Sequence, residues 1–429
     1  MKLLPNLSAR RWFLTAGCTA IALSASAEWE QVLSLPCTYA HFITSEGIHL
    51  ASDLREDQKG GISYSEDNGK TWVKADVKDY WFSNFYEADG YLFATGSAGR
   101  IGRSEDGGRT WDILNYSKAI EEFVDPKAID GTSCYAITSL DGILYIGDFC
   151  GGGILRSENY GETWEHTDRE SLLIQVDSPE PIMDNFYNLT AFNGKIYSFG
   201  MYSVHSLNQA GGASKWDVEP INSNFMSQVT VMGDKMICGR SVMNFTTDVE
   251  YLIYNDGNEW GEIPRPDTDD NNVRAIVSDG NLLVTVHHGG PVYYTTDLGE
   301  NWEINEDLPS YTYPLTLVAD DNYIYTAIYS PLLDDANSGV WRISKAELGV
   351  SGINAATAEN GVRIEGGYIR TSGNADRIDV YSIAGENVLG ASGTDCLSTS
   401  SLAPGMYVYR VISGTESFSG KFVNNPSRQ

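Results

Sequence analysis

Three acids stand where they could supply general acid and base chemistry. Asp53 and Asp148 each end an alternating apolar run, and Asp184 stands shortly before another. Hydrolysis of a glycosidic bond uses two carboxyl groups on opposite sides of that bond. Asp53, Asp148 and Asp184 are therefore the candidate catalytic acids, although no two of them form a recognisable motif.

A second set of residues combines aromatic rings with arginine, histidine and amide groups. Aromatic rings stack on sugars, and polar side chains bond to the hydroxyl groups of sugars or to polar groups of a protein. The candidate ligand-binding residues are Trp81, Arg100, Tyr187, Tyr202, Arg240, Arg274, His287 and Tyr329. Asn84 and Phe149 are further candidates of the same kind.

Two short motifs resemble metal-ligand patterns. His287 and His288 are adjacent, so on a strand they point to opposite faces and do not readily bind one ion. Asp267, Asp269 and Asn271 space oxygen atoms like the start of a calcium-binding loop, but the glycine and the distal glutamate of an EF-hand are missing. We expect no cofactor, with calcium at these three residues as the alternative.

The elements that would position these candidates are repeated along the chain. A hydroxyl residue, an acid or amide, a glycine and a tryptophan follow at fixed offsets in residues 65–72, 104–111, 157–164 and 295–302. Asp or Asn bonds to the backbone of a tight turn, Gly permits positive φ, and Trp anchors the next strand. We expect a hairpin across each segment and a structural role for Asp67, Trp72, Asp106, Trp111, Asn159, Trp164, Asp297 and Trp302.

A second marker is a turn pair followed by an alternating apolar strand, which predicts a hairpin. It occurs seven times, at residues 46–47, 89–90, 141–142, 193–194, 233–234, 279–280 and 321–322. A spacing of roughly 40 to 50 residues is typical of four strands per propeller blade. The segment with Trp29 precedes the first turn pair, and we expect it to supply the outer strand of the last blade and close the ring.

The tryptophan segments resemble the Asp-box, or BNR, repeat of sialidase-like β-propellers. The resemblance implies an all-β fold with a seven-bladed β-propeller at residues 28–346, whose ligands meet the loops at one mouth of the central channel. The candidate residues above are expected on that face, where such residue types also occur without a ligand. A sialidase is disfavoured, because the Arg-Ile-Pro motif is missing and seven blades exceed the six of sialidases.

Three alternating runs near the end of the chain, residues 378–388, 402–411 and 420–423, predict strands of a separate unit. Residues 347–359 are rich in small residues and read as a linker. Residues 360–429 resemble the C-terminal (Por) sorting domain of type IX secretion in Bacteroidetes, which implies a small β-sandwich, export across the outer membrane and contact with the type IX secretion machinery. An accessory carbohydrate-binding sandwich is the alternative.

The N-terminus and the charge limit the location and the partners. Residues 1–27 have the basic start, apolar stretch and small residues of a signal peptide, by the Sec or the twin-arginine route. With 58 acidic against 29 basic residues, the chain would repel nucleic acid. No later segment has the length of about 20 apolar residues that a transmembrane helix needs. We expect a monomer, secreted or on the outer-membrane surface.

Two functional classes stay open: a propeller that binds glycan or protein, which we favour, and a secreted glycoside hydrolase. Whether the chain is an enzyme is left undecided by its sequence. Five cysteines remain after the signal peptide, without the spacing of a zinc site. Cys134 and Cys150 could pair, or the cysteines could be free thiols.

Overall fold

The computed structural model describes residues 28–35, 38–53, 60–77, 81–125, 133–149, 151–176, 179–208, 214–222, 226–240, 252–266, 273–287, 290–309, 312–330, 337–346, 348, 362–365, 368–382, 387–399, 401–402, 405–414 and 416–424. The predicted signal peptide, the calcium candidates Asp267, Asp269 and Asn271, and nearly all of the predicted linker lie outside the described residues.

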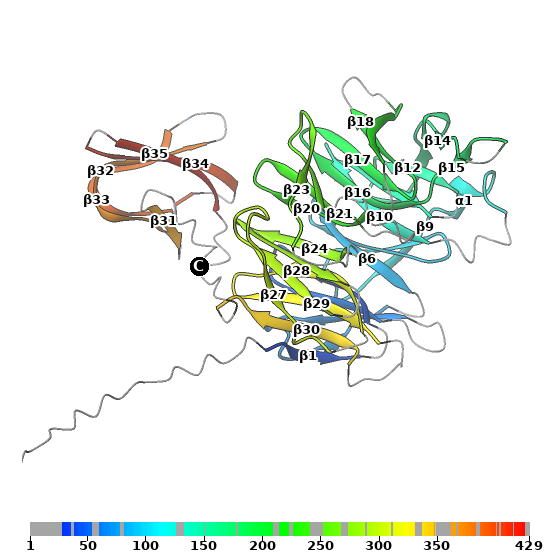
Figure 1. Ribbon diagram of the computed structural model, residues 1–429, viewed down its shortest axis with the longest axis horizontal. Helices are drawn as coiled ribbons and strands as arrows, with labels where there is room; N and C mark the ends of the chain where they lie inside the picture. Colours follow the sequence, from blue (N-terminus) through cyan, green and yellow to red (C-terminus); the bar gives the residue numbers. More distant parts are fainter. Residues whose placement is uncertain are drawn as a thin grey trace, which may run out of the picture.

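Seven four-stranded antiparallel sheets form the body of the described chain, and each contains one of the seven predicted turn pairs. The innermost strands contact one another in sequence all the way round, and the last contacts the first. In Figure 1 the labelled inner strands β6, β10, β16, β20, β24 and β28 surround the middle of this body. The predicted all-β propeller fold is confirmed.

The strands of the seven sheets fall into four positions, counted outward. The innermost strands are β2 (Thr38–Ile43), β6 (Phe82–Ala88), β10 (Cys134–Leu140), β16 (Phe186–Phe192), β20 (Met226–Met232), β24 (Val273–Asp279) and β28 (Tyr313–Ala319). The second strands are β3 (His49–Asp53), β7 (Tyr91–Gly96), β11 (Ile143–Asp148), β17 (Lys195–Gly200), β21 (Lys235–Arg240), β25 (Leu282–His287) and β29 (Tyr323–Tyr329).

The outer half of each sheet is shorter. The third strands are β4 (Gly61–Ser65), β8 (Arg100–Ser104), β12 (Gly153–Ser157), β18 (Ser203–Asn208), β22 (Leu252–Asn255), β26 (Val292–Thr295) and β30 (Gly339–Ser344). The outer strands are β5 (Val73–Lys74), β9 (Asp112–Asn115), β13 (Glu165–His166), β19 (Asp217–Asn222), β23 (Trp260–Ile263), β27 (Glu303–Asn305) and β1 (Glu30–Ser34).

The predicted turn pairs connect the first and second strands of the sheets. Asp89 and Gly90 both have positive φ, of 51° and 82°, as do Asp141 with Gly142 and Asn193 with Gly194. Two consecutive residues with positive φ define the tight hairpin turn whose twist matches that of the strands. These dipeptides therefore fix the register of the inner hairpins.

The ring is closed by the N-terminal strand. β1 pairs antiparallel with β30, so the last sheet takes its outer strand from the beginning of the chain. Trp29, directly before β1, packs in the core between the sixth and seventh sheets and donates from Nε1 to Asn305 Oδ1 over 3.0 Å. The predicted closure is confirmed.

Apolar side chains fill the interface between each pair of neighbouring sheets, including the pair that joins the seventh sheet to the first. Between the first two sheets, Leu50 and Phe82 are fully buried, and the Phe82 and Trp111 rings lie 6.4 Å apart. Each buried side chain of this size stabilises the fold by roughly 1.5 to 3 kcal/mol. Stacking against neighbours therefore supplies the core, which no single sheet has.

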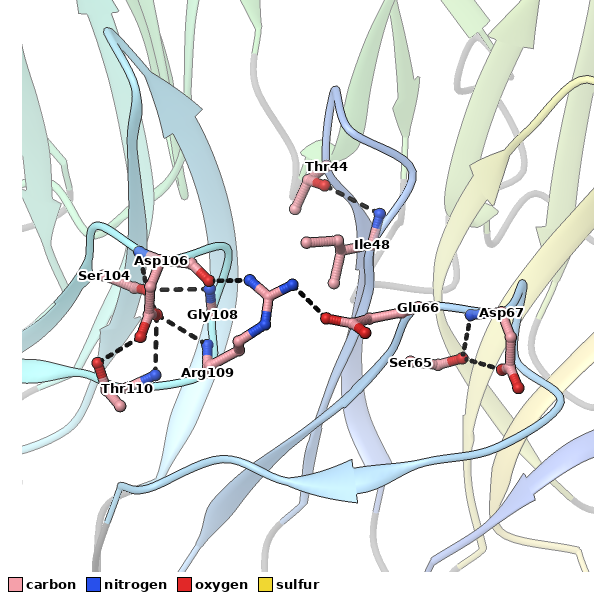
Figure 2. Close-up of polar contacts among 10 residues, drawn as sticks. All are labelled: Thr44, Ile48, Ser65, Glu66, Asp67, Ser104, Asp106, Gly108, Arg109 and Thr110. Atoms are coloured by element: carbon pink, nitrogen blue, oxygen red, sulfur yellow. Dashed lines mark hydrogen bonds and ion pairs between the residues drawn. The ribbon is translucent and has the colours of Figure 1, made fainter. Parts of the chain in front are cut away.

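The turns predicted at residues 65–72, 104–111, 157–164 and 295–302, which we name the box turns, lie between third and outer strands. They share one hydrogen-bond pattern. In the second sheet, Ser104 Oγ donates to Asp106 Oδ1 over 2.9 Å, and the Gly108 N–H donates to Ser104 Oγ over 2.9 Å. Thr110 donates to Asp106 from its N–H over 2.9 Å and from its hydroxyl over 2.7 Å. Figure 2 shows that Asp106 is surrounded by the donors of its own turn.

The box turns of neighbouring sheets are also linked to each other. Arg109 forms an ion pair with Glu66 of the first sheet and donates to the Asp106 carbonyl (Figure 2). Arg103 donates to the Tyr160 carbonyl of the third box over 3.2 Å. Arg342 of the closing sheet donates to the Asn68 carbonyl of the first box over 3.1 Å. Arginine side chains thus connect neighbouring sheets through the box turns at the outer edge of the propeller.

Two of the connections between neighbouring sheets contain additional short elements. α1 (Ser117–Ile120) lies between the second and third sheets, and the 3-10 helix η2 (Glu170–Leu172) with the hairpin β14 (Leu173–Ile174) and β15 (Ile182–Met183) lies between the third and fourth. Among the described residues, no helix is long and apolar enough to cross a membrane.

Cys134 is a buried free thiol, which favours free cysteines over a disulfide between Cys134 and Cys150.

The C-terminal strands form a five-stranded antiparallel sheet, coloured orange to red in Figure 1. They are β31 (Val362–Glu365), β32 (Tyr368–Ser382), β33 (Asn387–Ser398), β34 (Gly405–Ser413) and β35 (Glu416–Asn424). The long strand β32 changes register between Arg370 and Ala375 and pairs with β31, β33 and β34 along its length. This unit has its own apolar core around Ile378 and Val380.

Candidate functional site

Every inner strand of the propeller is interrupted by a β-bulge near its beginning. In β2 the pairing moves from Thr38 with Asp53 to Ala40 with Ser52, so that Tyr39 has no partner residue. Register shifts at the corresponding positions occur in all six other inner strands. From each shift we take one residue whose side chain the structure describes, and we name these seven the bulge ring: Tyr39, Ser83, Tyr135, Tyr187, Gln228, Arg274 and Leu315.

The bulge ring lies at one end of the central channel. Each bulge stands at the start of its strand, remote from the hairpin turn at the other end. All seven ring residues line one cavity of about 640 Å³, together with residues farther along the same strands, among them Phe42, Phe85, Ile137, Leu189 and Val229. Because a bulge turns the side chain away from the regular alternation, it can direct residues of seven strands into the same opening.

Aromatic rings form one side of this opening. Tyr39 and Trp81 pack edge to face with ring centroids 5.0 Å apart, and Trp81 packs on Tyr135 at 6.0 Å. Phe149 lies 5.4 Å from Tyr135 and 5.1 Å from Tyr187, again at steep angles. Edge-to-face packing fixes the orientation of each ring. Tyr135 and Tyr187 are nearly parallel, with an angle of 25° between their ring planes, so the wall combines steep contacts with one stacked pair.

The tyrosines of the wall are neutral hydrogen-bonding groups. Burial, followed by the neighbouring Tyr135 hydroxyl, raises the pKa of Tyr39, and Arg274 acts in the opposite direction. Burial and Tyr135 also raise the pKa of Tyr187. Their hydroxyl groups consequently stay protonated at physiological pH and can both donate and accept.

Arg274 is the one charged residue among the described residues that line the cavity. Its Nε is buried and has no hydrogen-bond partner in the described part of the chain, and the same holds for Trp81 Nε1 and Thr316 Oγ1. Arginine and tryptophan nitrogens can only donate. Arg274 and Thr316 line the opening, whereas Trp81 is not among its lining residues.

Polar residues of the inner strands also hold the ring together. Ser83 Oγ donates to the Cys134 carbonyl over 2.6 Å, and Asn84 Nδ2 donates to the Tyr135 carbonyl over 3.0 Å. Gln228 Oε1 accepts from the Leu317 N–H over 3.1 Å. Backbone groups on the channel side of an inner strand have no ladder partner, and these side chains satisfy some of them.

The candidate catalytic acids are buried and bonded to the protein. Asp148, which is 0 % exposed, accepts from the Gly152 N–H over 2.9 Å and from the Tyr116 hydroxyl over 3.2 Å. Asp184, also fully buried, accepts from the N–H groups of Met201 and Ser203 over 2.9 and 3.0 Å and from the Ser203 hydroxyl over 2.8 Å.

Asp53, at the end of β3, is 3 % exposed. None of the three acids lines the cavity, and no Asp or Glu is among the described lining residues. This arrangement fits carboxylates that organise loops, and it offers no acid pair at the described opening.

The structure gathers five of the residues predicted from the sequence. Tyr187, Arg274, Asn84 and Phe149 line the cavity, and Trp81 packs on its aromatic wall. Four other predicted binding residues do not line it, and these are Arg100, Tyr202, His287 and Tyr329.

Their positions explain why. His287 is fully buried against Tyr293 within its own sheet, with ring centroids 4.7 Å apart. Tyr329 packs on Tyr313 at 6.0 Å, and Tyr202 is 48 % exposed on the surface. Arg100 begins a third strand, and Arg240 ends a second strand with a side chain outside the described residues.

Tyr39 and Tyr135 are site residues that the sequence reasoning missed. Both stand second in an inner strand, as do Tyr187 and Arg274. Tyr135 and Tyr187 stand six residues before their turn pairs, Tyr39 seven and Arg274 five, so alignment on the turn pairs brings these positions to within one residue of one another.

Within the described residues, no group of three or more His, Cys, Asp or Glu side chains is placed to hold a metal ion. The carboxylates of Asp67 and Asp297 accept hydrogen bonds from groups of their own box turns. The backbone N–H of Thr71, followed by its hydroxyl, lowers the pKa of Asp67 to about 2. The Asn301 side chain and N–H lower the pKa of Asp297 to about 2 as well.

Solved structures share this architecture. The chain is a β-propeller. The extracellular domain of BT4673 from B. thetaiotaomicron has a TM-score of 0.53 at 11% identity over 94% of this chain and 60% of that one. A catalytically inactive virginiamycin B lyase from Staphylococcus aureus has a TM-score of 0.55 at 14% identity, covering 74% of this chain and 99% of the lyase.

YCF48 from Cyanidioschyzon merolae has a TM-score of 0.50 at 14% identity, covering 74% of this chain and 98% of its own length. At these identities the likeness shows the fold alone. No protein-family model matches the chain, and no curated protein matches it.

Proposed function

We propose that this protein is a ligand-binding propeller that takes a protein or glycan ligand at the bulge ring and does not cleave it. The observation that carries the proposal is the bulge in every inner strand, which directs residues from seven sheets into one opening. A repeated distortion of the sheets has a cost in pairing, and bulges are concentrated next to functional sites.

The composition of the opening supports binding. A cavity of about 640 Å³ is within the usual size of small-ligand sites, and its lining combines apolar and aromatic side chains with hydroxyl and amide groups and one arginine. One fold neighbour, YCF48, is described bound to D1 peptide, and another is an extracellular domain.

The placement of the acids supports binding over hydrolysis. Cleavage of a glycosidic bond needs two carboxyl groups about 5 to 10 Å apart on either side of the bond. Asp148 and Asp184 instead accept hydrogen bonds from loop backbone within the protein. A polysaccharide panel is therefore expected to show no release of reducing ends.

We also propose that residues 360–429 direct export, with the protein secreted or displayed at the outer-membrane surface. The five C-terminal strands and their separate core support a unit that folds by itself. In a Bacteroidetes host, the full chain should reach the medium or the cell surface, and a chain ending at residue 359 should stay in the periplasm. Equal export of both chains would contradict this role.

Binding is tested with a panel of immobilised oligosaccharides and short peptides and the full chain. Two tyrosines make a matched pair, because Tyr187 lines the cavity and Tyr202 is exposed outside it. Tyr187→Ala should weaken binding of a panel ligand at least about tenfold, as expected for an aromatic contact at a binding hot spot, and Tyr202→Ala should leave it unchanged. Equal effects of the two changes would refute the assignment of the site.

A further inference from the structure

We propose that the cavity accepts a monocarboxylate joined to an apolar body, with the carboxylate on Arg274 and the apolar body along the inner strands. This inference rests on the proposed function and specifies the chemistry of its ligand. The shared chemistry has two sources, a free organic acid and the C-terminal residue of a peptide.

The charge of the opening selects the head group. Arg274 is the one charged residue among the described lining residues, and it has no ion pair in the described part of the chain. Arg274 is partly exposed with its Nε buried, and a carboxylate compensates a single positive charge in a planar, bidentate geometry. A phosphate monoester would bring almost twice the charge. The single arginine therefore favours a carboxylate.

The unused hydrogen-bonding groups agree with an acceptor-rich head group. Arg274 Nε and Trp81 Nε1 are buried donors without partners among the described residues. Of these two residues, Arg274 lines the cavity, whereas Trp81 packs on the lining residues Tyr39 and Tyr135 and is not itself among them. A carboxylate has two oxygen atoms with lone pairs to accept from such donors.

The rest of the cavity selects the body of the ligand. Beyond the bulge ring, the lining includes the apolar residues Phe42, Phe85, Ile137, Leu189 and Val229 among polar residues such as Thr138, Asn188 and Thr190. An alkyl or phenyl group would gain from burial against the apolar residues. The apolar part of the lining therefore favours an apolar body for the ligand.

The test is calorimetric titration of the full chain with two pairs of probes. The first pair is 3-phenylpropionate and its uncharged amide. The second is a short peptide ending in phenylalanine with a free carboxyl group and the same peptide with a C-terminal amide. Each acid should bind at least about tenfold more tightly than its amide, as a lost charge-assisted hydrogen bond predicts. If the peptide acid alone binds, the source is a chain end, and if both acids bind, a free acid suffices.

Three variants locate the head group. Arg274→Gln should weaken binding of the acids by about tenfold to a hundredfold and leave the amides unchanged. Arg274→Lys keeps the charge but not the bidentate geometry, so it should recover part of the loss. Arg100→Gln removes an arginine that does not line the cavity and should have no effect. Circular dichroism confirms that each variant is folded.

Two results would overturn the inference: acids and amides that bind equally, or acid binding that is unaffected by Arg274→Gln. Neither result decides the proposed function. A panel ligand that depends on Tyr187 but not on Arg274 would keep the bulge ring as the binding site while removing the carboxylate from its ligand.

Discussion

Lowering the pH should destabilise the contact between the closing sheet and the first sheet, through two buried histidines. His41 Nε2 and His49 Nδ1 lie 3.2 Å apart, and both rings pack on Tyr325 of the closing sheet. Burial, followed by the neighbouring His49, lowers the pKa of His41 well below its usual value, and burial lowers the pKa of His49 to about 4.

The direction in which stability changes with pH follows because the folded state keeps both histidines neutral. Unfolded histidine has a pKa of about 6.5, so between pH 6.5 and about 4 the unfolded chain binds protons that the folded chain does not. The stability is complete above pH 6.5 and is lost as the pH falls through this window. At pH 5 the unfolded chain binds the His49 proton about thirtyfold more favourably, which corresponds to about 2 kcal/mol. His41 acts in the same direction.

The assay is urea denaturation followed by circular dichroism at pH 7.5 and pH 5. His49→Gln should reduce the loss of stability between the two pH values by about 2 kcal/mol relative to the unchanged protein. Trp72 contacts both histidine rings but does not titrate, so Trp72→Phe should lower stability equally at both pH values. The reasoning is refuted if His49→Gln has the same pH dependence as the unchanged protein.

Two further changes test the scaffold. Asp106→Ala removes the acceptor for four groups of its box turn and should lower the free energy of unfolding by about 1 to 2 kcal/mol in urea denaturation. Exposed Asp112→Ala should change it by less than about 0.5 kcal/mol. Gly339 has a φ of 140°, and a Cβ there would overlap the Leu33 carbonyl oxygen of the closing strand. Gly339→Ala should therefore detach β1 and expose it to limited proteolysis, while Gly47→Ala, whose Cβ would meet open space, should leave β1 protected.

The sequence was sufficient for the scaffold because its signals are local. A dipeptide such as Asp89-Gly90 specifies its turn through the φ values it tolerates, and the box residues bond within a few positions of one another. Periodic repetition of these markers along the chain then predicts the propeller. The closure by β1 was predicted because the segment with Trp29 precedes the first turn pair of the repeat.

The site was predicted only in part because it depends on geometry between distant strands. Arg274 and Tyr187 were candidates by residue type, but nothing in an alternating strand pattern reveals a bulge, and so Tyr39 and Tyr135 were passed over. Asp148 and Asp184 are acids near the mouth, and only the structure shows that backbone donors occupy them. Burial of a carboxylate by its own loop has no signature in the sequence.

The central claim is that the bulge ring is the ligand site. It is tested most directly by a substitution that narrows the opening of the cavity. Leu315 belongs to the ring and carries no polar group, so Leu315→Trp adds bulk at the opening without removing a hydrogen bond. The decisive measurement is the dissociation constant of a panel ligand for this variant, folded as judged by circular dichroism. We predict at least about a tenfold weaker affinity. An unchanged dissociation constant would contradict the assignment of the ligand site to the bulge ring.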